Sequence, residues 1–374
     1  MRPNSRKSLL YRDCVALTLG GALLGMPLAD ALADSTLPPI SIGAGMRTSF
    51  THTDADSKIF SDASGNPSKT KDDFALDSIR LYVSGSVTEN IKFMFNTEYN
   101  GSTENVQVMD AAAMFSFSDA FNIWAGRFLP PSDRSNLYGP YYANNWSVYN
   151  DGVQDGYPFE SVGRDDGVMY WGQFGGLKVA AGAFDVNNAI QRSTTGSSDV
   201  LWAGRVMYDF WEVENGYYLN GTYYGEKDLL ALGVSGQSAG TGHAYSGDFL
   251  LEKNFKGAGV LNVEAEYAKY DGLGGYAATA LPAFESSDGY YGLVGYLLPQ
   301  VVGVGKFQGL VKYAETTFKY PTTSDIKQKT AEFDVNYIIK PFNARVTLFF
   351  VDYSFDGISG KDFKQVGLGV QLQI

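Results

Sequence analysis

The final stretch of the chain, residues 365–374, reads QVGLGVQLQI. Apolar side chains stand at every second position from Val366 to Ile374, and the positions between them hold only glutamine or glycine. Because successive side chains of a β-strand point to opposite faces, this stretch predicts a strand with one apolar and one polar face. The alternation recurs at 40–47, 79–83, 91–96 and 331–337, and no stretch beyond the first 33 residues sustains a comparable helical period.

Repeated segments of this kind predict a sheet of sixteen antiparallel strands. Short links, such as 88–90 and 175–176, alternate with long polar links, such as 53–73 and 129–165. Bacterial transmembrane barrels show this asymmetry, with short periplasmic turns and longer external loops. The strands are expected at 39–52, 74–87, 91–100, 106–117, 120–128, 166–174, 177–186, 199–210, 228–237, 244–254, 259–270, 287–298, 305–317, 327–338, 343–354 and 363–374.

One Tyr-rich segment, 216–224, could be a further strand, which would make seventeen. An even number of strands is expected for a single-chain bacterial barrel whose two termini lie on the same side. We therefore assign 211–227 to an unusually long periplasmic connection. Totals of fourteen or eighteen strands remain open as alternatives.

A soluble β-sandwich would alternate in the same way, but two features favour a barrel in a membrane. The expected inward face carries charged residues, which a dry sandwich core would not tolerate without partners. The other face is rich in Val, Leu, Ile and Phe, with aromatic residues near the strand ends, as lipid contact requires. The expected fold over residues 34–374 is thus an all-β, transmembrane, antiparallel β-barrel.

The composition excludes several other classes of protein. The formal net charge of −12 argues against a nucleic-acid partner, whose phosphates need a basic patch. The single cysteine, Cys14, has no partner for an internal disulfide, and no Cys/His cluster offers a metal or cofactor site. His52 and His243 are the only histidines, and no Gly-x-Ser-x-Gly motif accompanies them, so an enzyme is not expected.

The first 33 residues have the features of a secretory signal peptide. A basic region ends at Arg12, an apolar stretch covers 15–28, and Ala31-Leu32-Ala33 fits a cleavage site with small residues. We therefore expect an exported protein.

A barrel of sixteen strands is too wide for side chains to fill, so the lumen should hold water. We expect opposed basic and acidic walls, whose field would orient solutes and influence ion passage. The residues expected to line this pore are Arg47, Arg80, Lys92, Glu98, Asp110, Lys178, Arg205, Asp248, Glu264, Glu266, Lys306, Lys312, Glu332, Asp334 and Arg345.

The link at 129–165 is too long for an idle connector and is rich in aromatic residues. We expect it to fold into the lumen as a constriction loop, and an external cap or a subunit contact is the alternative. Its candidate constriction charges are Asp133, Arg134, Asp151, Asp155, Glu160 and Arg164.

Three stretches carry a resemblance to a known family: 79–85 (IRLYVSG), 125–131 (AGRFLPP) and 163–168 (GRDDGV). Together with 223–233, they make the chain similar to the phosphate-selective (O/P-type) porins of Gram-negative outer membranes. The resemblance implies a sixteen-stranded homotrimeric pore with an inward-folded third loop, in contact with membrane lipid and lipopolysaccharide. Phosphate selectivity in that family uses a ladder of arginines, and Arg47, Arg80, Arg127 and Arg164 would form only part of one.

The expected function is passive diffusion of small hydrophilic solutes or ions through a water-filled channel of the outer membrane. Mixed lumenal charges would set its selectivity, with a weak or cation-leaning preference. A phosphate- or anion-selective porin is one alternative. A plugged barrel that serves as a scaffold for a periplasmic partner is another.

Overall fold

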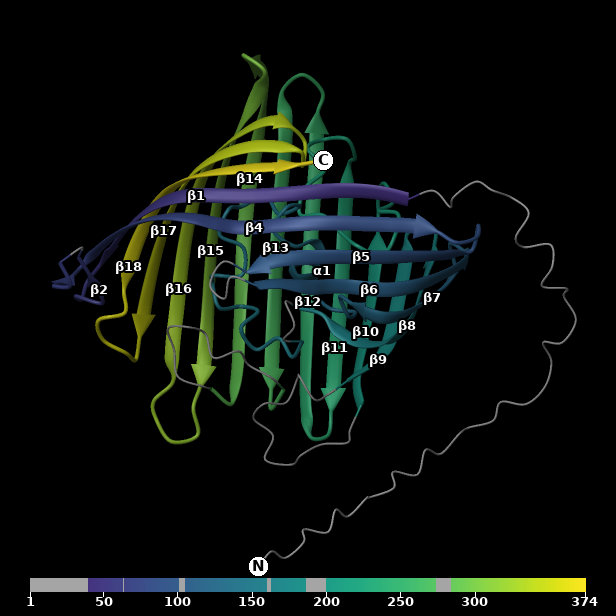
Figure 1. Ribbon diagram of the computed structural model, residues 1–374, viewed down its shortest axis with the longest axis horizontal. Coiled ribbons are helices and arrows are strands. Elements are labelled where there is room, and N and C mark those ends of the chain that lie inside the picture. The colour runs from purple at the N-terminus through teal and green to yellow at the C-terminus, as the bar shows by residue number, and fades with distance from the viewer. Residues whose placement is uncertain (1–39, 63, 101–104, 160–162, 186–199, 274–283) are drawn as a thin grey trace, which may run out of the picture. The chain divides into compact units, whose positions relative to one another are not determined.

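The barrel closes on itself through hydrogen bonds between its first and last strands. The computed structural model describes residues 40–62, 64–100, 105–159, 163–185, 200–273 and 284–374. Sixteen antiparallel strands follow one another around the ring in chain order, and β1 (Ile40–Ala55) pairs with β18 (Phe363–Gln373) over 45–55. Strands at the front of the barrel cross those at the back at a steep angle (Figure 1), as the tilt of a closed barrel requires.

The predicted strand count and strand positions are confirmed. Each observed strand end lies within four residues of its predicted position. The remaining barrel strands are β4 (Thr70–Ser86), β5 (Ile91–Asn100), β6 (Asn105–Ser118), β7 (Phe121–Phe128), β8 (Asp165–Phe174), β9 (Leu177–Asp185), β10 (Val200–Asp209), β11 (Leu229–Ala239), β12 (Gly242–Phe255), β13 (Gly259–Asp271), β14 (Ser286–Val302), β15 (Gly305–Lys319), β16 (Ile326–Lys340) and β17 (Ala344–Asp356).

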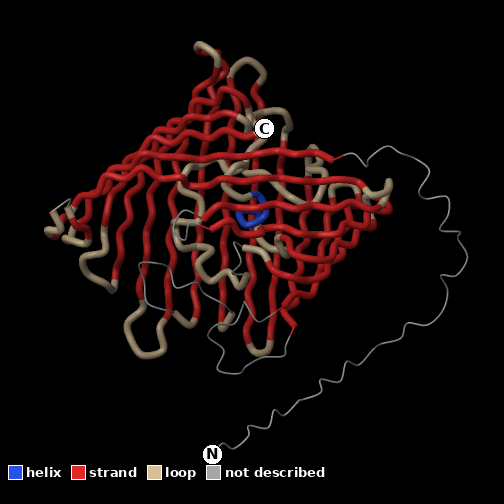
Figure 2. Tube along the Cα trace, in the orientation of Figure 1, coloured by secondary structure: helices blue, strands red, loops and turns tan. Residues whose placement is uncertain are grey.

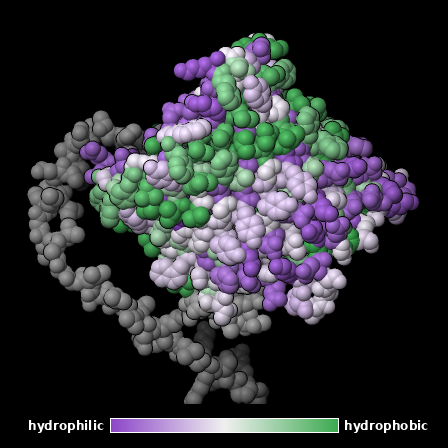
Figure 3. Space-filling model, turned by 180° about the vertical axis from the view of Figure 1, so that it is seen from behind, coloured by the Kyte–Doolittle hydropathy of each residue, from purple (hydrophilic) through white to green (hydrophobic). Residues whose placement is uncertain are grey.

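The alternation in the sequence becomes an alternation of burial. Along β15, Lys312 and Thr316 face the interior and are buried, whereas Val311 and Tyr313 face outward and are about half exposed. On the face seen from behind, hydrophobic side chains form a band across the barrel wall, and hydrophilic ones gather below it and at its margins (Figure 3). An apolar outer wall of this kind suits contact with lipid.

The two ends of the barrel differ. At one end, which we call the short-turn end, six links are short turns, at 87–90, 119–120, 175–176, 256–258, 303–304 and 341–343. At the opposite, long-loop end, the link between β1 and β4 carries a small hairpin of β2 (Phe60–Ser61) and β3 (Pro67–Ser68). The β1–β4 ladder continues to Asp54 and Thr70, beyond the predicted strand ends. The sequence did not predict this extension, because the residues there are polar on both faces and show no alternation.

The half of β4 nearest the long-loop end pairs with a neighbouring strand on one side only. Residues 70–79 bond to β1, and the ladder between β4 and β5 begins at Arg80 and Glu98. A register shift between Arg47 and Thr48 lets Asp77 bulge out of the β1–β4 ladder. Residues 70–79 of β4 therefore have no paired strand on the β5 side in the described part of the chain.

The described residues contain one short helix, α1 (Arg134–Tyr138), which lies within the ring of strands (Figure 2). Asp133 precedes it as N-cap and accepts the hydrogen bond of the Asn136 amide. No helix among the described residues has the length and apolar character that a membrane span needs. The predicted signal peptide, residues 1–33, lies outside the described residues.

Candidate functional site

The described parts of the long link between β7 and β8, residues 129–159 and 163–164, lie inside the barrel, and we call them the inner loop. Its backbone is held by charged side chains that point inward from the wall. The Trp146 amide donates to Asp334 at 2.8 Å, and the Ser147 amide donates to Glu332 at 2.8 Å. Both carboxylates are on β16 and buried. The acidic side chains of this wall therefore anchor the loop.

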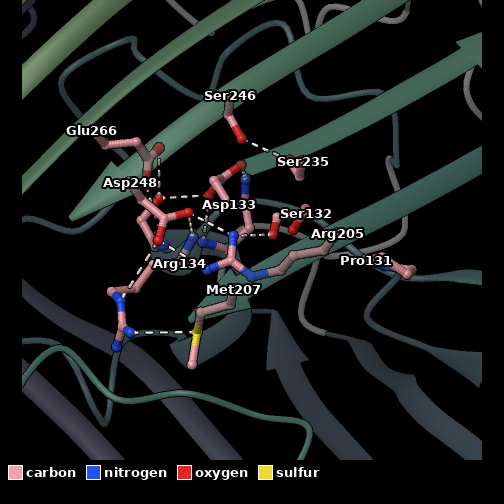
Figure 4. Close-up of polar contacts among 12 residues, drawn as sticks. Pro131, Ser132, Asp133, Arg134, Arg205, Met207, Ser235, Ser246, Asp248 and Glu266 are labelled. Atoms are coloured by element: carbon pink, nitrogen blue, oxygen red, sulfur yellow. Dashed lines mark hydrogen bonds and ion pairs between the residues drawn. The ribbon is translucent and has the colours of Figure 1, made fainter. Parts of the chain in front are cut away.

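A second group of contacts fixes the start of the inner loop. Arg205 on β10 forms a bidentate ion pair with Asp248 on β12, at 2.5 and 2.8 Å, and also donates to the Ser132 carbonyl. The Arg134 amide donates to Asp248 at 3.2 Å. Figure 4 shows Arg205 and Asp248 pointing towards each other, and the Arg134 guanidinium turned towards Met207. Two wall charges thus neutralise each other here, and the same ion pair holds the backbone at the start of the inner loop.

Trp146 of the inner loop packs against the part of the wall formed by β17, β18 and β1. Its ring stacks on Phe349 at a centroid distance of 5.8 Å, and the Arg47 guanidinium lies 4.0 Å from the ring centroid. Arg47 also donates to the Trp146 carbonyl at 2.9 Å. Gly369 on β18 makes room for the ring, because a Cβ atom there would lie closer than 3.0 Å to it. A small residue on the inner face of β18 is therefore needed for docking of the loop.

The return half of the inner loop is held in the same way. Asp151 forms a buried ion pair with Lys312 at 2.6 Å. Gln154 donates to Glu266 at 2.7 Å, and the Ser135 hydroxyl donates to the same carboxylate at 3.1 Å. The loop therefore follows the wall from β10 round to β18 and β1, where its partners lie.

The connection between β10 and β11, residues 210–228, also enters the barrel, and we call it the strap. It contains no strand, as predicted, but it is more than a long turn. Glu214 binds the Arg134 guanidinium through both carboxylate oxygens, at 2.9 and 2.5 Å, and both side chains are fully buried. The Gly221 amide donates to the Tyr142 carbonyl at 3.0 Å. Two inward segments, one from each end of the barrel, thus meet inside it.

The sequence reasoning missed this role of the strap. Its length beyond an ordinary turn and its four tyrosines were visible signals, since long loops rich in aromatic residues tend to pack. The role was not predicted because an irregular segment has no periodic sequence pattern from which its position in the fold could be inferred.

A cavity of about 950 Å³ remains between the inner loop and the wall formed by β4, β5 and β6. It adjoins residues 73–78 of β4, which pair with β1 but not with β5. Its polar lining includes Asp77, Arg80, Glu98, Asp155 and Arg164. We call this space the vestibule.

Both arginines of the vestibule have a carboxylate partner. Arg80 pairs with Glu98, and Arg164 pairs with Asp110 at 3.3 Å. Asp77 accepts a hydrogen bond from Ser49. Among the described residues, neither Asp77 nor Asp155 has a cation within ion-pair distance. The fixed charge of the vestibule is therefore negative when both aspartates are ionised.

Asp155 differs from an ordinary surface carboxyl. Burial, together with the nearby charge of Asp151, raises the pKa of Asp155 to about 7. The charge of the vestibule therefore changes within the neutral pH range.

The structure places most of the predicted pore residues at the interior, bonded rather than free. Lys92 is exposed and Lys306 half-buried, both close to short turns. Asp133 and Asp151 in the inner loop are buried, and Glu160 lies outside the described residues. The buried side chains of the predicted pore-lining set are Arg47, Arg80, Glu98, Asp110, Lys178, Arg205, Asp248, Glu264, Glu266, Lys312, Glu332, Asp334 and Arg345.

The proposed basic track is wrong at one position. Arg127 does not share the inward face of β7 with Trp124 and Phe128, which are buried. It pairs instead with the exposed Asp166 of β8 at 2.7 Å, on the outer face. The expected field between a basic and an acidic wall is also reduced, because the inner loop binds charges of both walls.

Comparison with known proteins supports the fold alone. No family model and no curated protein matches the chain by sequence. Solved structures do match it. The anion-selective porin from Comamonas acidovorans covers 90% of this chain and 100% of its own, with a TM-score of 0.57 at 16% identity. OprB of Pseudomonas putida matches over 90% of this chain and 94% of its own, with a TM-score of 0.57 at 9% identity.

OmpT, an outer membrane protein of Vibrio cholerae, covers 91% of this chain and 99% of its own, with a TM-score of 0.55 at 12% identity. The chain therefore has the closed sixteen-stranded fold of outer-membrane porins. At these identities the selectivity of any one neighbour does not transfer to this chain.

Proposed function

We propose that this protein is a porin-type channel of a Gram-negative outer membrane, through which small hydrophilic solutes and ions diffuse passively. The vestibule is the observation that carries the proposal, because it is an open space between the inner loop and the wall with charged side chains in its lining. The apolar outer wall and the likeness to porin folds support the location. The barrel would contribute the radius of the pore and the electrostatic field inside it, and it would catalyse no reaction.

The charges of the vestibule support a preference for cations. Its two arginines are paired with carboxylates, whereas neither Asp77 nor Asp155 has a cation within ion-pair distance among the described residues. Negative side chains that lack a counter-charge attract mobile cations into a channel. A phosphate- or anion-selective channel is the rival function, and the Comamonas neighbour is named for anion selectivity. The rival is weakened because both arginines of the vestibule, Arg80 and Arg164, are paired with carboxylates.

Planar-bilayer recording tests this function. The purified barrel should form stable open channels, and the reversal potential in asymmetric KCl should have the sign of a cation-preferring pore. In the double variant Asp77→Asn/Asp155→Asn the preference should fall towards that of free solution. Glu89→Gln is the matched control, since Glu89 is an exposed carboxylate in a short turn. A reversal potential of the anion sign would favour the rival, and a folded but silent barrel would favour the plugged scaffold.

Three further predictions remain proposals at this point. The signal peptide at residues 1–33 would direct export, and lipopolysaccharide and lipid would surround the barrel. A homotrimer is implied by the family resemblance. Cross-linking of the protein in native membranes tests the trimer, which a band at the monomer position alone would contradict.

A further inference from the structure

The ladder between β10 and β11 does not end where the strands do. The Phe210 amide donates to the Leu230 carbonyl at 2.8 Å, and the Glu212 amide donates to the Asp228 carbonyl at 3.1 Å. A two-residue turn could join the chain just beyond this last bond. Instead, 213–227 leaves the ladder and runs into the barrel. Its length is therefore not needed to connect the two strands.

The strap crosses the interior at the short-turn end. On one side, Tyr217 and Tyr218 pack on Trp124 of β7, at centroid distances of 5.1 and 5.6 Å. On the other, Glu252 of β12 accepts hydrogen bonds from Thr222 at 2.7 Å and from the Tyr223 amide at 2.9 Å. Strands β7 and β12 stand apart in the ring. The strap is thus tied to two separate parts of the wall.

The strap also approaches the wall on the vestibule side. The Tyr218 hydroxyl lies 3.9 Å from the Met94 sulfur on β5. Met94 follows the short turn before β5, whereas Glu98, four residues further along the same strand, lines the vestibule. A solute that leaves the vestibule along β5 towards the short-turn end therefore meets Tyr218 and Met94.

The inner loop holds the strap in this position. Arg134 binds the Glu214 carboxylate and donates to the Asn220 carbonyl at 2.8 Å, while Tyr217 donates to the Leu129 carbonyl at 2.9 Å. Burial alone would raise the pKa of Glu214, but the Arg134 charge keeps it below its ordinary value. The pair is therefore ionised at neutral pH, and neither side chain reaches water.

We propose that the strap is a second constriction of the channel, which sets the size limit at the short-turn end, and that the Arg134–Glu214 pair locks it to the inner loop. This inference rests on the proposed channel function and assigns to the strap a part of its selectivity. Tyr218 would act as the size-determining side chain and Glu214 as a positioning residue.

The test replaces 214–226 by Asn-Gly, so that a tight turn closes the ladder after Val213 and Lys227. Single-channel conductance and the swelling of liposomes in sugars of increasing size are compared with the wild type. We expect conductance to rise by about twofold or more and larger sugars to enter, because the pore gains cross-section. Tyr218→Ala should shift the sugar limit in the same direction by a smaller amount.

Glu214→Gln tests the lock. Removing one partner of a buried ion pair should shift the balance between the docked and undocked strap by more than about a hundredfold. The expected sign is fluctuation of conductance between two levels, the higher one near that of the shortened variant. Asn215→Ala is the matched control, since Asn215 is an exposed neighbour on the strap. The heat-dependent gel mobility of folded barrels verifies folding of each variant.

The outcomes separate the two proposals. If the wild type conducts and the folded, shortened variant shows the same conductance and sugar limit, the inference is overturned and the channel stands. If the wild type is silent and the shortened variant conducts, the strap is a complete plug, and the open-channel function fails while the constriction role is supported. If both folded proteins are silent, both proposals fail.

Discussion

The substitution Gly369→Ala probes the docking of the inner loop from the opposite wall. The added Cβ atom would overlap the Trp146 ring, and over-packing of this kind costs about 1–3 kcal/mol. Trp146 is held by a charge-assisted bond to Asp334, worth about 1.5–3 kcal/mol. Its contact with Arg47 adds about 0.5–2 kcal/mol. The loop should therefore stay docked but strained, and the free energy of unfolding should fall by about 1–3 kcal/mol.

A double-mutant cycle isolates this effect. Urea unfolding in detergent, followed by circular dichroism, is measured for Gly369→Ala, Trp146→Ala and the double variant. Once the ring is removed the collision disappears, so the two changes should couple by about 1–3 kcal/mol. Gly309→Ala is the control, because its new Cβ meets nothing within 4 Å. Strict additivity, or equal losses for Gly369→Ala and Gly309→Ala, would refute the docking of Trp146 against β18.

Three other predictions follow from named contacts. Because the pKa of Asp155 is about 7, this carboxyl is neutral below that pH and charged above it. The cation preference of single channels should therefore rise between about pH 6 and 8. The substitution Asp155→Asn should abolish the rise. Lys312→Met leaves Asp151 buried without its cation and should lower the free energy of unfolding by about 3–5 kcal/mol, whereas Lys312→Met/Asp151→Leu should recover most of the loss in urea titrations. Arg127→Ala breaks an ion pair on the outer face, so it should lower the free energy of unfolding by at most about 1 kcal/mol and leave reversal potentials unchanged. An altered reversal potential would instead place Arg127 on the permeation path.

The barrel was predictable because its signal is local. The stretch 365–374 alternates over its whole length, and β18 pairs through it with both β1 and β17. A period of two forces one set of side chains inward, so strand positions follow without knowledge of neighbours. The short link at 175–176 and the long link at 129–164 then place the two ends of the ring.

The interior was predictable only in part. The inward direction of Glu332 and Lys312 follows from strand phase, but their partners lie far along the chain: Ser147 for the first and Asp151 for the second. Asp77 was missed because a register shift places it in the vestibule, and such a shift depends on the neighbouring strand. Arg127 was misplaced because the phase of β7 was not fixed in the sequence; the buried Trp124 and Phe128 fix it and turn Arg127 outward.

The amino-acid sequence by itself determined the period, the strand count and the apolar exterior, because these depend on which residues stand two positions apart. Only the tertiary structure decided which lumenal charges remain free. The inner loop and the strap have no repeating pattern, and their positions depend on pairs such as Arg134 and Glu214, which lie 80 residues apart in the chain. Long-range pairing of this kind, which single-chain periodicity cannot encode, decides where open space is left.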